Sequence, residues 1–188
     1  MLSWLTPSGF RARQAKQLKT AEIYGAVVTQ ARNPAFYAEA GVPDTPEGRF
    51  EVIVLHLYLL LERLRAAGEP GVEPSRMLIE HLVIDMDDQM REMGVGDLTV
   101  PKTVKRAARM LFARTEDYRA ALAEPEDAAL TAALGRAFPA SAAIGATERM
   151  ARYVRQAKVH LEATPSESLL AGGVTFPRPL LENKDEPT

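Results

Sequence analysis

Cysteine is absent from the 188 residues, tryptophan occurs once, and aromatic side chains make up only 6 %. Without cysteine the chain has no disulfide framework, no cysteine-ligated zinc or iron–sulfur cluster and no thiol nucleophile. Long apolar runs are missing too. The longest, residues 52–61, has ten residues and is interrupted by His56, whereas a bilayer-spanning helix needs about 20. An apolar fraction of 46 % is nevertheless that of a globular protein.

Net charge is nearly absent as well, because 23 Lys+Arg stand against 25 Asp+Glu, and this argues against a dedicated nucleic-acid binder. The charges are unevenly placed. Residues 1–32 carry +4, residues 33–99 carry −8, residues 100–119 carry +4 and residues 120–188 carry −2. Such blocks predict either separate positive and negative surfaces or plain solvated helix faces, and the sequence favours neither.

Strand signals are almost absent, so we predict an all-α fold of about six to seven helices in one domain, residues 10–163. The expected helices cover residues 10–31, 46–67, 74–93, 100–123, 125–137 and 141–163. Asp44 or Thr45 can cap the second helix, and Pro46 fits its first turn. Because residues 52–61 are apolar all round, this helix should be the buried centre of the domain.

The two ends of the chain are expected to differ from this domain. Residues 1–9 begin with the apolar MLSWL and precede a basic run that contains no acid before Glu22. A loose helix end, a membrane-surface anchor and an organelle transit peptide all fit this pattern. Residues 164–188 are rich in proline and contain two adjacent glycines, so we expect an extended or mobile tail.

No constellation of residues points to catalysis, a cofactor or a metal. His56 lies inside an apolar helix, which favours a hydrogen-bonded core residue over a haem ligand. His81 precedes Asp85 by four residues, as a structural pair would. The acids of residues 85–88 fall in a predicted helix rather than a calcium loop, and GVGD at residues 94–97 lacks the Lys-Ser/Thr of a phosphate loop. The chain is therefore predicted to bind rather than to catalyse.

A basic stripe is expected on the helix at residues 100–123. Lys102, Lys105, Arg106 and Arg109 stand at positions i, i+3, i+4 and i+7 of one helical face. Such a stripe can hold phosphates. Few aromatic residues accompany it, so we expect no specific DNA binding, whereas ribosomal RNA or anionic lipid stays open.

Residues 85–122 resemble the ubiquinol–cytochrome c chaperone family, of the alphaproteobacterial type. The family-like motif is DMD followed by REMGVGDL and a lysine-rich helix start, and it contains Asp85, Asp87, Met93, Gly94, Val95, Gly96 and Asp97. RFE at residues 49–51, LHL at 55–57 and ERL at 62–64 are similar upstream, as is AALTAAL at 128–134 downstream. The resemblance covers about residues 20–160.

This resemblance implies an all-α fold without catalysis or a cofactor. Members of the family bind newly made cytochrome b near the ribosome and the inner membrane and hold it for assembly of the cytochrome bc complex. The expected partners are cytochrome b, the ribosome, an anionic membrane surface and a second assembly factor. The expected location is cytoplasmic or peripheral at the inner membrane, and mitochondrial in a eukaryote.

Two surfaces are predicted to carry this function. The first is a client groove beside the second helix, formed by Phe50, Leu57, Tyr58 and Leu61, for which a plain buried core is the alternative. The second is a surface for a partner, ribosome or lipid, formed by Arg91, Lys102, Lys105, Arg106 and Arg109, for which simple solvation is the alternative. A haem- or lipid-handling protein using His56 and His81, or a general adaptor, are the competing functions.

Overall fold

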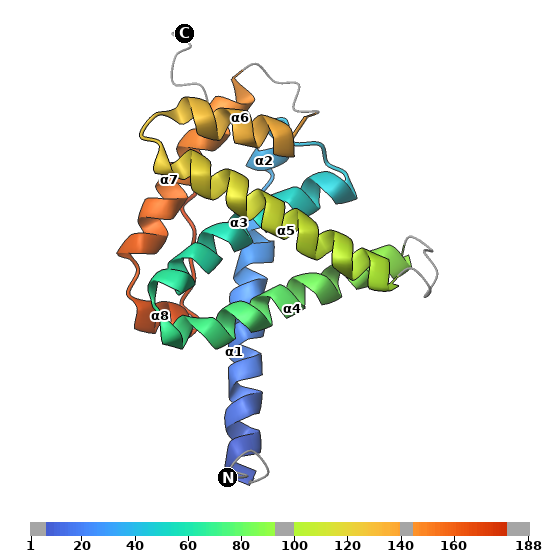
Figure 1. Ribbon diagram of the computed structural model, residues 1–188, viewed down its shortest axis with the longest axis vertical. Coiled ribbons are helices and arrows are strands. Elements are labelled where there is room, and N and C mark those ends of the chain that lie inside the picture. Colours follow the sequence, from blue (N-terminus) through green and yellow to red (C-terminus); the bar gives the residue numbers. More distant parts are fainter. Residues whose placement is uncertain (1–6, 93–99, 140–144, 180–188) are drawn as a thin grey trace.

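The computed structural model describes residues 7–92, 100–139 and 145–179, and within these ranges all regular structure is helical (Figure 1). The helices are α1 (Pro7–Ala31), α2 (Ala35–Ala38), α3 (Pro46–Ala66), α4 (Glu69–Glu92), α5 (Val100–Ala123), α6 (Asp127–Ala137), α7 (Ala146–Ala163) and α8 (Ser166–Leu170). The all-α prediction is confirmed.

Helix α3 is the centre of the fold, as its apolar run predicts. The side chain of Thr45 caps its first turn by accepting a hydrogen bond from the backbone N–H of Gly48 at 3.1 Å. Residues 50–60 are all buried, because α3 packs against α1, α4, α5 and α7. Neither α3 nor any other helix in the described part of the chain has the length and hydropathy that a bilayer-crossing helix requires.

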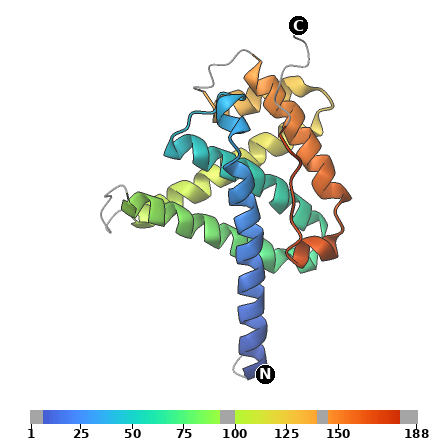
Figure 2. The same ribbon diagram turned by 180° about the vertical axis from the view of Figure 1, so that it is seen from behind.

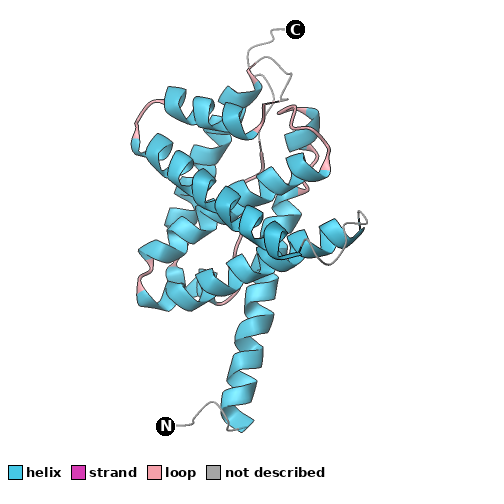
Figure 3. Ribbon diagram, turned by 45° about the vertical axis from the view of Figure 1, so that its right-hand side comes forward, coloured by secondary structure: helices cyan, strands magenta, loops and turns pink. Residues whose placement is uncertain are grey.

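Helix α1 is packed along only part of its length. Ile23, Tyr24, Val27 and Ala31 are buried against the domain, and Thr20 is the first buried residue of this stripe. Residues 14–19 are all exposed. The N-terminal part of α1 accordingly stands clear of the other helices in all three ribbon views (Figures 1, 2 and 3).

Helices α3 and α4 meet at a tight corner. A Cβ atom at Gly71 would lie 2.0 Å from the backbone oxygen of Leu64, so only glycine allows the first turn of α4 to approach the last turn of α3 this closely. Helix α4 therefore begins at Glu69, and the predicted start near residue 74 is wrong. Pro74 lies inside the helix, where it removes one backbone hydrogen bond.

The C-terminal segment corrects the prediction of an extended or mobile tail only over residues 166–170, and residues 180–188 of that tail lie outside the described residues. Residues 166–170 form α8, and Arg63 holds this end by donating from Nη2 to the oxygens of Thr164 at 2.8 Å and Ser166 at 2.9 Å. The following segment is extended and returns along the core toward the opposite end of the molecule (Figure 2), where Gln30 Nε2 donates to the Pro177 carbonyl at 3.0 Å. Helices α6 and α7 begin at residues 127 and 146 rather than 125 and 141.

Candidate functional site: an apolar groove between α3, α4 and α5

An apolar groove with a volume of about 650 Å³ lies where α3, α4 and α5 meet. Its lining consists of Leu61, Glu62, Arg65, Gly68, Gly71, Val72, Ser75, Ile79, Ala108, Leu111, Phe112, Thr115 and Arg119. Val72 on α4 and Phe112 on α5 are 66 % and 69 % exposed. Two exposed apolar side chains that border one apolar hollow form a patch of the kind that marks interaction surfaces, unlike singly scattered ones.

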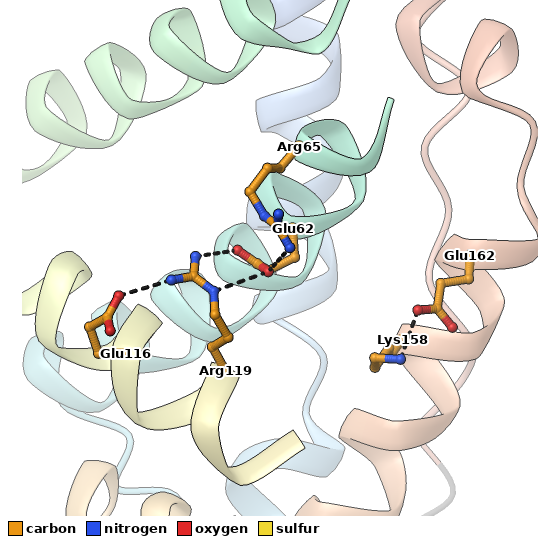
Figure 4. Close-up of polar contacts among 6 residues, drawn as sticks. All are labelled: Glu62, Arg65, Glu116, Arg119, Lys158 and Glu162. Carbon is orange, nitrogen blue, oxygen red and sulfur yellow. Dashed lines mark hydrogen bonds and ion pairs between the residues drawn. The ribbon is translucent and has the colours of Figure 1, made fainter. Parts of the chain in front are cut away.

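One side of the groove carries a polar rim formed by Glu62, Arg65, Glu116 and Arg119 (Figure 4). Arg119 Nη2 donates to Glu62 Oε1 at 2.6 Å, and Arg65 Nη2 donates to Glu62 Oε2 at 3.1 Å. Arg119 Nη1 also donates to Glu116 Oε1 at 2.9 Å. The rim therefore ties α3 to α5 through one shared carboxylate.

The carboxyl group of Glu62 is kept ionised by this rim. Burial alone would raise its pKa, but the hydrogen bonds and charges of Arg119 and Arg65 outweigh burial and hold the pKa of Glu62 below its ordinary value. Proton uptake would thus weaken the rim only in acid.

A second, smaller cavity of about 250 Å³ lies on the other side of the rim, between α3, α5 and α7. Tyr58 and Leu161 contribute to its lining, and Lys158 pairs with Glu162 there at 2.7 Å (Figure 4). Because Glu62, Arg65 and Arg119 line both hollows, the polar rim separates an apolar groove from a more polar one.

The predicted client residues do not come together as a groove. Phe50, Leu57 and Tyr58 are buried, with exposed fractions of 6 %, 0 % and 3 %. The idea that they leave apolar atoms exposed is wrong, and their alternative as core residues holds, because α3 is covered by four neighbouring helices. Leu61, at the end of this helix, does line the apolar groove.

The predicted basic surface is described only in part. Lys105 and Arg109 are exposed on α5. The side chains of Arg91, Lys102 and Arg106 lie outside the described residues, as does the motif loop from Met93 through Gly94, Val95 and Gly96 to Asp97. Of the two motif acids on α4, Asp85 accepts a hydrogen bond from the Tyr24 hydroxyl at 3.0 Å, and Asp87 is half-buried.

His56 is a core residue rather than an open ligand. Its Nδ1 lies 2.7 Å from the Val52 carbonyl and its Nε2 lies 2.6 Å from the Tyr153 hydroxyl. Because a carbonyl can only accept, Nδ1 carries the proton and Nε2 accepts from Tyr153. Complete burial lowers the pKa of His56 to about 4. Both ring nitrogens are occupied, which leaves no position for a haem iron.

The other candidates for chemistry are also accounted for. The ring of His81 stacks on Tyr24 with 5.5 Å between centroids, which places His81 in a structural contact. Among the described residues, no group of three or more His, Asp or Glu side chains is arranged to hold a metal ion.

The groove residues that matter most carry little signal in the sequence. Val72 is a single large apolar residue in a polar stretch, Phe112 follows Met110 and Leu111 with nothing to mark it as the exposed one, and Arg119 belongs to a helix with many charges. Their one shared signal is helical spacing: Ala108, Phe112, Thr115 and Arg119 follow one face of α5. Such a face becomes a groove wall only when α3 and α4 supply the other sides.

Comparison with known proteins adds the family. The sequence model of the ubiquinol-cytochrome C chaperone family matches residues 38–176. Ubiquinol-cytochrome c reductase complex assembly factor 1 of Mus musculus is 25 % identical over 166 residues, which cover 87 % of this chain and 56 % of the mouse protein. The Xenopus laevis protein of the same name is 25 % identical over 162 residues, covering 85 % of this chain and 80 % of the relative. The chain thus spans little more than half the length of the mouse relative.

A solved structure has the same architecture. The crystal structure of the Cbp3 homolog from Brucella abortus matches with a TM-score of 0.81 and 33 % sequence identity, covering 89 % of this chain and 93 % of that one. Fold and sequence together define an all-α protein of a chaperone family. The chain belongs to the ubiquinol-cytochrome C chaperone family.

Proposed function

We propose that this protein is a non-enzymatic chaperone that binds newly made cytochrome b and assists assembly of the ubiquinol–cytochrome c reductase complex. Support comes from family membership over residues 38–176 and from relatives named as assembly factors of that complex. The single structural observation that carries the proposal is the apolar groove between α3, α4 and α5.

The chemistry of the client matches this groove. A newly made membrane protein presents apolar helices that need cover before they are packed, and a groove between helices is a common way to hold one. Val72 and Phe112 stand on opposite walls, on α4 and α5, with Leu61 of α3 between those helices. An apolar helix lying in the groove would contact all three and would bury side chains that are now exposed.

The basic face of α5 is proposed as a second contact surface. Lys105 and Arg109 are exposed on it, and the sequence continues the stripe at Lys102 and Arg106. A ribosome or a second assembly factor with an acidic surface would fit these charges. In this proposal the protein works at the cytoplasmic side of the inner membrane, or in the mitochondrion of a eukaryote.

The groove is tested by a double variant, Val72→Ser with Phe112→Ser. Both side chains are largely exposed, so the fold should persist while the apolar contact is lost. A matched control is Ile84→Ser with Val159→Ser, since these residues are 57 % and 63 % exposed but do not line the groove. Each tagged variant is purified from cells making labelled cytochrome b, and the co-purified label and the haem b spectrum of the complex are measured.

The groove variant should retain less than about a tenth of the wild-type label, because losing two buried apolar contacts costs about 1.4 kcal/mol or more. The control variant should behave as the wild type. If the groove variant recovered as much labelled cytochrome b as the control variant, the groove would not be the client site. Normal levels of the complex in cells without the protein would disprove the assembly function itself.

A further inference from the structure

The N-terminal part of α1 is an unpacked helical arm. We call residues 7–19 the α1 arm. Its described side chains, Arg11 and residues 14–19, are all exposed, and burial begins only at Thr20. The arm projects away from the helical domain at the opposite end from α6 (Figures 1 and 3). A helix of this length is marginal by itself in water, so a surface that it can lie on would stabilise it.

The arm carries charge of one sign. Residues 1–21 contain four basic residues, Arg11, Arg13, Lys16 and Lys19, and no acid. Lys19 uses its ammonium group within the molecule, donating to the Ala171 carbonyl at 2.7 Å. Arg11 and Lys16 are further along the arm and exposed, so they are presented to an outside partner rather than to the body of the protein.

The pattern of α1 changes where the helix leaves the domain. Inside the domain, Thr20, Ile23, Val27 and Ala31 form the buried stripe. One turn earlier the same stripe reaches Lys16, because residues four apart share a helix face. The apolar part of this stripe packs against the domain. Its cationic continuation in the arm is suited to contact with an anionic partner.

We infer that the α1 arm docks on an anionic lipid surface. The negative potential of such a surface attracts each nearby Lys or Arg side chain, and exposed apolar side chains strengthen the contact by inserting between the lipids. Leu18 is 61 % exposed on the arm. The sequence before the arm is MLSWL, which lies outside the described residues, and its Trp and Leu side chains are typical of the membrane interface. Binding of nucleic acid would need only the basic residues of the arm. The apolar residues beside them therefore favour lipid as the partner.

This inference is independent of the proposed client groove. It places the membrane contact on α1, whereas the client and ribosome surfaces are on α3, α4 and α5. An α1 variant that no longer binds lipid should therefore still co-purify cytochrome b. A failure of the lipid inference can therefore be told apart from a failure of the client-groove proposal.

The test is co-sedimentation of the full chain with lipid vesicles. Vesicles of phosphatidylcholine alone are compared with vesicles in which about a third of the lipid is phosphatidylglycerol, at about 50 mM and about 500 mM salt. The arm variant is Arg11→Glu with Lys16→Glu. The control is Lys105→Glu with Arg109→Glu, which changes the net charge equally but on the basic face of α5.

The wild type should bind the anionic vesicles at low salt, lose most binding at high salt and ignore the neutral vesicles. The arm variant should bind the anionic vesicles at least about tenfold more weakly, and the α5 control should keep binding. Circular dichroism checks the fold of each variant, and Arg11→Gln with Lys16→Gln replaces the arm variant if the helical signal falls.

Three results would overturn the inference. The first is equal binding to neutral and anionic vesicles. The second is loss of vesicle binding by the α5 variant but not by the arm variant. The third is unchanged vesicle binding by the arm variant together with loss of binding to polyuridine, which would assign the arm to nucleic acid.

Discussion

Arg119 and Glu62 form a two-pronged pair across the junction of α5 and α3. Nη2 lies 2.6 Å from Oε1, and Nε lies 3.3 Å from Oε2. Both residues line the apolar groove and the smaller cavity. The wall between the two hollows is therefore an ion pair rather than packed apolar side chains, and its strength depends on the charge of one carboxylate.

Replacing Glu62 with glutamine should weaken this wall in a pH-dependent way. The pKa of Glu62 is lowered in the fold, so its stabilisation is fully present above the ordinary value of 4.5 and is lost as pH falls through the lowered folded value. We expect Glu62→Gln to reduce the free energy of unfolding by about 1 kcal/mol at pH 7. Urea titrations at several pH values should show the difference from wild type shrinking in acid.

Glu124→Gln is the control for this experiment, because Glu124 is an exposed acid on no wall of either hollow. It should change the free energy of unfolding little at any pH. A Glu62→Gln deficit that stays constant from pH 7 down to strongly acid solution would show that the carboxylate acts by shape rather than by charge.

His56 should give the protein a second dependence on pH. Its pKa falls from an ordinary 6.5 to about 4 because the ring is completely buried. Between these values the unfolded chain binds a proton that the folded protein does not, so stability should drop by up to about 1.4 kcal/mol for each pH unit as acid is added. Above 6.5 and below about 4 this contribution should be flat.

The measurement compares wild type with His56→Gln and with His160→Gln. Glutamine at position 56 does not titrate, so the fall in unfolding free energy between pH 6.5 and 4 should become shallower. His160 is half-buried and contacts the Thr175 hydroxyl at 2.9 Å, and its replacement should leave the steep fall in place. If His160→Gln made the fall shallower and His56→Gln left it steep, His56 would not be the residue responsible for this dependence on pH.

Gly71 should be the least replaceable glycine of the groove. An added Cβ would lie 2.0 Å from the Leu64 carbonyl oxygen, so Gly71→Ala should push α4 away from α3 at a cost of about 1–3 kcal/mol. Gly135→Ala is the matched control, because no atom lies within 4 Å of a Cβ there. Alanine in that helix should be neutral or stabilise by up to about 1 kcal/mol. Thermal unfolding of both variants measures the contrast.

The helical framework was largely predictable from sequence because its signals are local. The apolar run of residues 52–61 identifies the central helix, and the Thr-Pro pair at residues 45–46 marks its start. The beginning of α4 was not predictable in this way. Pro70 and Pro74 both suit a first helical turn. The close contact of Gly71 with Leu64 decides between them, and this contact joins two helices, so the pattern of α4 alone does not reveal it.

The candidate site was less predictable, because burial is a property of the whole fold. Phe50, Leu57 and Tyr58 looked suitable for a client on apolarity alone, yet α3 is surrounded and they belong to the core. Phe112 has the same kind of side chain and is exposed. The sequence patterns of α3 and α5 by themselves do not show which of these apolar side chains are buried and which is exposed. The short α8 was missed for a similar reason, since it depends on hydrogen bonds from the distant Arg63.

Arg114 and Glu51 fix the position of α5 against α3, and their separation should be costly. Arg114 Nε and Nη2 donate to the two Glu51 oxygens at 2.9 and 2.7 Å, and Glu51 is only 7 % exposed. Arg114→Met would leave a carboxylate buried without its cation, so we expect the free energy of unfolding to fall by about 3–5 kcal/mol. The double variant Glu51→Gln with Arg114→Met removes the charge and should recover part of this loss.

An exposed arginine provides the comparison. Arg76 pairs with Glu73 and Glu80 on the solvent side of α4, and Arg76→Met should change the free energy of unfolding little, because water replaces the lost contacts. Chemical denaturation of the four proteins at neutral pH gives all three differences. If Arg114→Met were no more damaging than Arg76→Met, the buried pair would not be what holds the α5 wall of the groove in place.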